Sequence, residues 1–211
     1  MSVPAAQPQR LPRGIRIAAV LCLIFSGLTG MSSVTEASSL AQFSEYKEAV
    51  LSNAGRFGDR DANEHVLLAQ FSALEPMRDS RTALLGSLAV VCAVVFVAAA
   101  RMLRPGGMPR EGMRRLLSGA AILAAILRTI DGAQWMVVVD RMSAALVKGP
   151  FPDWQDPTSV ELIQRFGPAV LAAGYIGMTA FVAGAFVLLG QYFRSERVRQ
   201  VVTAQDGPAQ E

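Results

Sequence analysis

The amino-acid sequence predicts an all-α integral membrane protein, a four-helix transmembrane bundle with an extracytoplasmic helical cap. Four long apolar stretches occur along the 211 residues, and the segments between them are alternately rich in arginine and rich in acidic residues. Charged residues make up 18% of the chain, against about 25% in ordinary soluble domains. We therefore expect residues 1–211 to form a single membrane domain.

The four apolar stretches cover approximately residues 15–34, 82–102, 116–139 and 168–193. A helix rises about 1.5 Å per residue, so about 20 apolar residues cross the hydrocarbon core of a bilayer. The last three stretches meet that length, whereas Ser32 and Ser33 dilute the end of the first. Backbone groups within lipid must be paired internally, and the alternation typical of strands is absent, so each span is predicted to be a helix.

The distribution of charge predicts the orientation of the chain. Eleven arginines and four acidic residues lie in the segments 1–16, 101–115 and 194–211. Eight basic and twelve acidic residues lie in the two outer segments, 34–81 and 140–166. By the positive-inside rule, the N-terminus, the 103–115 loop and the C-terminal tail are cytoplasmic, and the protein lies in the cell membrane.

The first span also fits a second interpretation. Arg10, Arg13 and Arg16 precede the apolar run 17–30, and the small residues near Ala37 resemble a signal-peptidase site. Cleavage after Ala37 would leave three spans and the same cytoplasmic C-terminus.

The outer segments are patterned as helices. Two amphipathic helices joined near residues 55–59 are predicted within 34–81, with apolar residues at helical spacing. Their apolar faces either pack against each other and the bundle or provide a docking surface for a partner. Trp154 in the second outer segment and Trp135 near the outer end of the third span are candidate anchors at the membrane interface.

Small residues mark the faces through which the spans are expected to pack, because lipid offers no hydrophobic drive for helix association. Such faces occur in the first span at Ala18, Cys22, Ser26 and Gly30, in the second at Gly86, Ala89 and Ala93, in the third at Ala121, Ala124, Ala125 and Gly132, and in the fourth at Ala169, Ala173, Gly177, Ala180 and Gly184. Either all four faces meet inside one bundle, or one of them faces outward and mediates oligomerisation.

The third span carries the most costly residues of the sequence. Arg128 and Asp131 lie near its centre at a spacing of i, i+3, so they share a helical face and can pair, with Gln134 at the edge of that face. An ionised side chain at mid-bilayer costs about 2.5–3.5 kcal/mol on insertion scales. The pair either orients helices and subunits or lines a pathway for an ion, a proton or a substrate. In the structural case, exchanging the two residues is expected to restore part of the function.

Several chemistries have no support in the residues. Both cysteines, Cys22 and Cys92, fall inside spans, and no CxxC pair exists. His65 is the only histidine, which excludes a bis-histidine haem within one chain. We therefore expect no catalytic site, no metal and no cofactor. The basic residues follow the membrane topology, so nucleic acid is not an expected partner.

These observations predict a non-enzymatic membrane interaction or assembly protein that acts through its outer amphipathic helices and the Arg128–Asp131 pair. Its expected partners are the lipid bilayer and either another membrane protein or further copies of the chain. The alternative is a small transporter or channel subunit in which Arg128 and Asp131 line a polar pathway.

Overall fold

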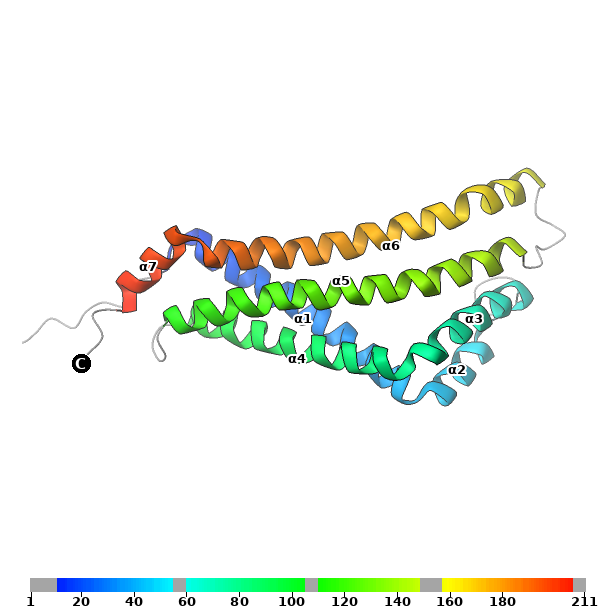
Figure 1. Cartoon of the computed structure of the whole chain (residues 1–211), viewed down its shortest axis with the longest axis horizontal. Helices are drawn as coiled ribbons and strands as arrows, with labels where there is room; N and C mark the ends of the chain where they lie inside the picture. Colours follow the sequence, from blue (N-terminus) through cyan, green and yellow to red (C-terminus); the bar gives the residue numbers. More distant parts are fainter. Residues whose placement is uncertain (1–10, 55–59, 105–109, 149–156, 207–211) are drawn as a thin grey trace, which may run out of the picture. The chain divides into compact units, whose positions relative to one another are not determined.

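The computed structural model describes residues 11–54, 60–104, 110–148 and 157–206. These residues are almost entirely helical (Figure 1). The long helices are α1 (Arg13–Ala41), α4 (Arg78–Leu103), α5 (Arg110–Lys148) and α6 (Pro157–Arg194). The shorter elements are α2 (Phe43–Ser52), α3 (Arg60–Leu74), the 3₁₀ turn η2 (Glu75–Met77) and α7 (Glu196–Asp206).

Each predicted span lies inside one long helix, and the described residues contain four helices long and apolar enough to cross a membrane. This confirms the prediction of an all-helical protein with four such helices. The helices also continue past the apolar stretches. The 39 residues of α5 extend about 58 Å, roughly twice the hydrocarbon thickness of about 30 Å. Glu36 and Arg81, which the sequence places in an outer segment, therefore lie in helices that are continuous with apolar stretches.

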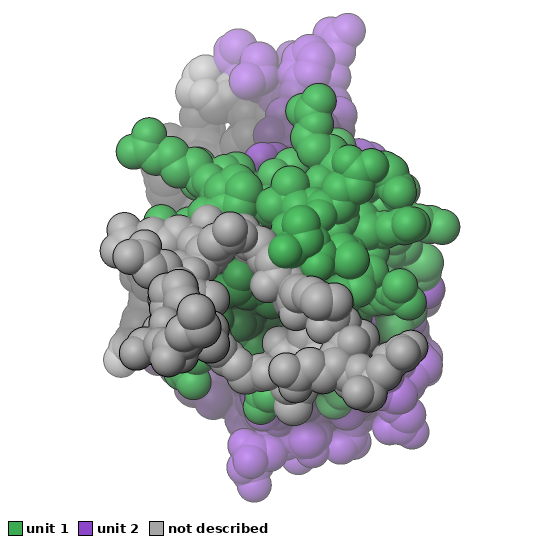
Figure 2. All heavy atoms as spheres, turned by 90° about the vertical axis from the view of Figure 1, so that its left-hand side faces the viewer, with its two compact units in different colours: residues 1–32, 88–126, 182–211 green, residues 33–87, 127–181 purple. Residues whose placement is uncertain are grey.

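The chain divides into two compact units (Figure 2). Unit 1 comprises residues 1–32, 88–126 and 182–211, and unit 2 comprises residues 33–87 and 127–181. The four long helices each contribute residues to both units.

Unit 2 has an aromatic core that includes α2 and α3. The rings of Phe43 and Phe71 meet edge to face with centroids 5.7 Å apart, and Tyr46 lies 5.9 Å from Phe71. The buried members of this core are Leu40, Phe43, Phe71, Ala73, Leu74, Leu85 and Val138. The predicted apolar faces of the two outer helices are thus packed against each other and against the long helices of the same unit.

Unit 1 has a core built largely from small residues. Ala19, Cys22, Ala99, Ala121 and Ala124 are fully buried, and Phe25 meets Phe186 edge to face at 6.3 Å. The small residues of the first and third spans that were expected to face inward are largely buried here. α7, which was not expected from the sequence, completes this core with Val198 and Val202, both buried.

The small faces of α4 and α6 depart from the expectation that those of all four spans meet inside. On α4, Gly86 and Ala93 are exposed, and a Cβ atom added at Gly86 would meet nothing within 4 Å. On α6, Ala173, Gly177 and Ala180 are exposed, and a Cβ atom added at Gly177 or at Gly184 would meet nothing within 4 Å. The physical reason is that α6 contacts α5 through the opposite side, since Tyr175 and Thr179 lie one turn apart and Gly177 lies between them, about 200° around the helix. The structure therefore places this small face outward.

Candidate functional site

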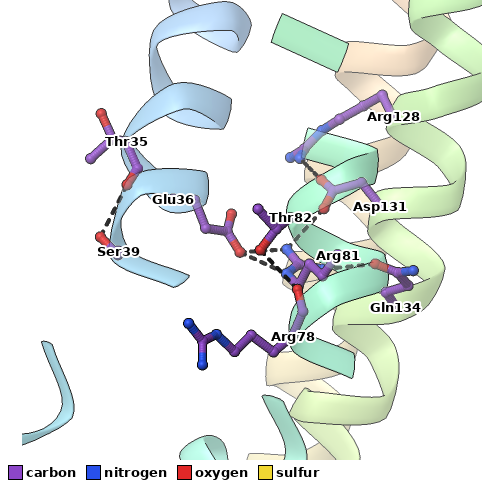
Figure 3. A network of polar contacts seen from close by, with 9 residues as sticks. All are labelled: Thr35, Glu36, Ser39, Arg78, Arg81, Thr82, Arg128, Asp131 and Gln134. Atoms are coloured by element: carbon purple, nitrogen blue, oxygen red, sulfur yellow. Dashed lines mark hydrogen bonds and ion pairs between the residues drawn. The ribbon is translucent and has the colours of Figure 1, made fainter. Parts of the chain in front are cut away.

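Four charged side chains from three helices meet in unit 2 (Figure 3). Arg128 and Asp131 on α5 form the ion pair that their spacing predicts. Asp131 also accepts a hydrogen bond from Nη2 of Arg81 on α4 at 2.8 Å. The same Nη2 atom lies 2.5 Å from Oε1 of Glu36 on α1. We call Glu36, Arg81, Arg128 and Asp131 the ion cluster.

Arg81 is the centre of the ion cluster. Its Nε donates to Glu36 at 2.8 Å, its Nη2 donates to both carboxylates, and its Nη1 lies 3.5 Å from Oε1 of Gln134. The guanidinium carbon lies 4.8 Å from the ring centroid of Trp135, a distance at which the cation is attracted to the ring face. Each guanidinium nitrogen of Arg81 therefore has a partner.

Trp135 links the ion cluster to α6. Its ring stacks on Tyr175 with centroids 5.2 Å apart and planes inclined by 30°. One turn further along α6, Thr179 lies so close to Gly132 that an added Cβ would be 2.3 Å from its Cγ2 atom. Glycine at position 132 therefore permits the close approach of α5 and α6 beside the cluster.

The first turn of α4 also holds the end of α1. Arg78, three residues before Arg81, donates from Nε to the carbonyl of Leu40 at 2.9 Å and from Nη2 to that of Ala41 at 3.0 Å. The last carbonyls of a helix lack partners within the helix and carry partial negative charge, which favours an arginine there. These contacts fix the last turns of α1 and thereby position Glu36.

Burial explains why both signs of charge are present. The side chains of Arg81 and Asp131 are 0% exposed, while those of Glu36 and Arg128 are 30% and 20% exposed. An unpaired ion in such a place would lose several kcal/mol of hydration, whereas paired ions with satisfied hydrogen bonds recover most of it. Two carboxylates and two guanidinium groups make the cluster electrically neutral.

Two members of the ion cluster lie at the ends of apolar stretches. Arg81 directly precedes the apolar run that begins at Thr82, and Glu36 follows the run that ends near Val34. Asp131 binds Arg81, which in turn binds Glu36, so a residue near the middle of the third apolar stretch meets side chains at the ends of two others. The depth of Arg128 and Asp131 in a membrane stays a prediction.

The structure thus brings Arg128, Asp131, Gln134 and Trp135 together, and it adds Glu36 and Arg81, which the sequence analysis counted only as outer charges. Trp135 contacts Arg81 and Tyr175, and its role as an interface anchor stays a prediction. Trp154 lies outside the described residues. Ser26, on the small face of the first span, donates to the carbonyl of Cys22 within α1.

The ion cluster joins three helices through their side chains. Within the described ranges, no group of three or more His, Cys, Asp or Glu residues could hold a metal ion. Each guanidinium nitrogen of Arg81 has a partner, and each carboxylate of the ion cluster binds a guanidinium group.

No family model matches the chain, and no curated protein or solved structure matches it.

Proposed function

We propose that this chain is a non-enzymatic membrane assembly protein that presents the outward small-residue face of α6 to a transmembrane helix of another subunit. The observation that carries the proposal is the exposure of Ala173, Gly177 and Ala180 on a helix that makes its contacts with α5 from the other side. In lipid, faces of small residues let two helix backbones approach closely, and this packing drives association.

The ion cluster serves this function as a scaffold. It ties α1, α4 and α5 together through side chains that are 45 and 50 residues apart in sequence. Its neutrality and the burial of Arg81 and Asp131 support a structural role. The outer helices α2 and α3 support the same scaffold, because Phe43, Phe71 and Leu74 are buried within unit 2 and not presented to a partner.

The proposal includes the predicted orientation in the cell membrane, with both termini cytoplasmic, and it includes retention of α1. Cleavage after Ala37 would remove Glu36 and leave Arg81 with one carboxylate in place of two. A mature protein whose mass includes residues 1–37 is therefore expected. Loss of those residues in the membrane-bound form would contradict the scaffold described above.

The test is the native mass of the full chain after mild-detergent extraction from its own membranes. We expect the wild type to carry a stoichiometric second subunit, either another protein or a second copy. Gly177→Leu should release that subunit while the thermal unfolding temperature is kept, because the leucine fills the gap between two helices and its Cβ atom meets nothing within 4 Å in its own chain.

Gly119→Leu is the matched control, because Gly119 is likewise exposed on a long helix and a Cβ added there meets nothing within 4 Å. The control should keep the second subunit. A wild type that is monomeric without partners, or a Gly177→Leu variant that assembles normally, would contradict the proposal.

A second function has one observation in its favour. Glu36 and Arg128 are both partly exposed, while Asp131 and Arg81 lie buried between them, as in a short polar path interrupted by an ion pair. In a transporter or channel subunit of this kind, Asp131→Asn would abolish flux in reconstituted vesicles and leave assembly intact. In the assembly protein, flux is absent in the wild type and Asp131→Asn lowers the amount of assembled protein.

A further inference from the structure

Unit 1 carries a surface of exposed arginines. They lie at or just outside the ends of the apolar stretches, at the start of α1 and α5, at the end of α4 and α6, and on α7. We call the following exposed residues the basic surface: Arg13, Arg16, Arg101, Arg104, Arg115, Arg194, Arg197 and Arg199. All four long helices therefore contribute arginines to the same unit, which is green in Figure 2.

Packing within unit 1 holds these helix ends together. Arg114 is 5% exposed and donates to the carbonyl of Phe193 near the end of α6. Ser118 donates to the carbonyl of Gly190 at 2.9 Å. A Cβ added at Gly14 would lie 3.0 Å from the hydroxyl oxygen of Tyr192, which places the start of α1 beside the end of α6 (Figure 1).

α7 adds arginines to the basic surface. Val198 and Val202 are 2% and 0% exposed, and their spacing of four residues turns one face of α7 into the core of unit 1. Arg197 and Arg199 are exposed on either side of Val198. A short helix with one apolar face packed inward and arginines outward is suited to the level of lipid headgroups.

The carboxylates described in unit 1 are already engaged. Glu111 accepts from Arg114 at 2.7 Å and from Arg115 at 2.8 Å. Chiefly the hydrogen bond from Arg114, with that from Arg115 in addition, lowers the pKa of Glu111 to about 2. Glu196 lies 3.4 Å from Arg199. Among the described side chains of this unit, none is left to neutralise Arg13, Arg16, Arg104, Arg194 and Arg197.

We propose that the basic surface binds the phosphates of anionic phospholipid headgroups. The guanidinium group is planar and matches phosphate with two parallel hydrogen bonds. These arginines lie within a few residues of apolar stretches long enough to cross a membrane. Their guanidinium groups are therefore held at the depth of lipid headgroups, which favours a lipid over a soluble polyanion as the ligand. Each arginine near an anionic leaflet contributes about 1 kcal/mol, which corresponds to about fivefold in affinity.

The test compares retained lipid on the purified full chain. The protein is delipidated in an uncharged detergent and mixed with micelles that contain phosphatidylglycerol or phosphatidylcholine, and bound lipid is counted by native mass spectrometry. We expect a preference for phosphatidylglycerol of about tenfold or more, which weakens as salt is added. Arg16→Gln/Arg197→Gln should reduce this preference by up to about 25-fold, at about fivefold for each arginine, and Arg16→Lys/Arg197→Lys should keep most of it.

The matched control is Lys148→Gln/Arg165→Gln, which removes two exposed charges from unit 2 and should leave the preference unchanged. Equal retention of the two lipids by the wild type would overturn the proposal, as would equal effects of the two glutamine pairs. Displacement of the lipid by inorganic polyphosphate at equal phosphate concentration would assign the surface to a soluble polyanion instead. If Arg16→Gln/Arg197→Gln does not fold, the proposal is tested by the single variant Arg197→Gln on α7. The salt dependence of the wild-type preference for phosphatidylglycerol then provides the second measurement.

Discussion

Among the described side chains, units 1 and 2 each bury one arginine, but they satisfy it in different ways. In unit 2, Arg81 is bound by carboxylates from two other helices, Glu36 on α1 and Asp131 on α5. In unit 1, the carboxylate that binds Arg114 belongs to Glu111, three residues earlier on the same helix. The contact of Arg114 with α6 is a hydrogen bond to the backbone carbonyl of Phe193. Carboxylate–guanidinium pairs join helices in unit 2, in addition to the bonds from Arg78 to backbone carbonyls. In unit 1, the hydrogen bonds from Arg114 and Ser118 to α6 both go to backbone carbonyls.

This difference decides what remains on the surface. The ion cluster of unit 2 contains equal numbers of positive and negative groups and is neutral. In unit 1, arginine far exceeds the described carboxylates, so most of its positive charge stays exposed. We infer that the charges of unit 2 hold the fold, and that those of unit 1 are available to the surroundings.

The largest effect is expected from Asp131→Asn. The asparagine leaves Arg81 with one carboxylate, Glu36, and removes the carboxylate that binds Arg128. A buried charge without a partner costs about 3–5 kcal/mol. We expect a clear fall in the thermal unfolding temperature in detergent. Glu111→Gln, which removes a carboxylate from unit 1, should have a much smaller effect. Similar losses in both variants would remove the distinction between the units.

The exchange of Arg128 and Asp131 tests the same network. From the sequence alone, the exchange is expected to rescue part of the function, since the pair is kept. In the structure, it would place an arginine at position 131 against Arg81. We therefore expect no rescue, and recovery of the wild-type unfolding temperature would show that Arg81 does not depend on residue 131.

The next effect is expected from Gly132→Ala. The added Cβ would lie 2.3 Å from Cγ2 of Thr179, so α5 and α6 must separate or Thr179 must change rotamer, at a cost of about 1–3 kcal/mol. Gly177→Ala is the control on the outward face of α6, where the added methyl group meets nothing. Thermal unfolding should separate the two alanine variants, and a Gly132→Ala protein as stable as the control would refute the close approach.

A smaller effect is expected from Ser118→Ala in unit 1. The serine hydroxyl is buried and donates to the carbonyl of Gly190 at 2.9 Å. Its removal should cost about 0.5–1.5 kcal/mol, the usual net value of one hydrogen bond. Ser87→Ala, which removes an exposed bond to the carbonyl of Ala83, should cost less when the two unfolding temperatures are compared.

The sequence predicts what depends on spacing along one helix. Span length gives the four long helices, and the spacing of i, i+3 gives the Arg128–Asp131 pair. The contact of Arg81 with Asp131 joins residues 50 positions apart, and no periodicity relates residues on different helices. The available signal was weak: Glu36 and Arg81 each lie next to an apolar stretch, where a charge can remain on a continuous helix.

The orientation of α6 was open for a similar reason. Its sequence shows two faces, one with Tyr175 and Thr179 and one with Gly177 and Ala180, and both suit helix packing in lipid. The contact of Thr179 with Gly132 on another helix decides between them. α7 had a usable signal in the spacing of Val198 and Val202, but two apolar residues in a polar tail are a weak pattern.

The smallest effect concerns pH and unit 1. The hydrogen bonds from Arg114 and Arg115 lower the pKa of Glu111, which lies before the apolar stretch of α5, from 4.5 to about 2. A carboxyl group with a lower pKa in the folded state stabilises the fold fully above its unfolded pKa of 4.5, and this contribution declines as the pH falls toward 2. The unfolding temperature of the wild type should therefore fall more steeply between about pH 5 and about pH 2.5 than that of Glu111→Gln. Glu45→Gln, which removes an exposed carboxylate on α2, serves as the comparison in unit 2.

If Glu111→Gln and the wild type lose stability in parallel, the acid sensitivity lies elsewhere, and the carboxylates of the ion cluster become the groups to test. If the unfolding temperatures of the wild type and Glu111→Gln become equal only at low pH, protonation of Glu111 accounts for the stability that unit 1 loses. That loss then occurs without breaking any contact between the helices of unit 1.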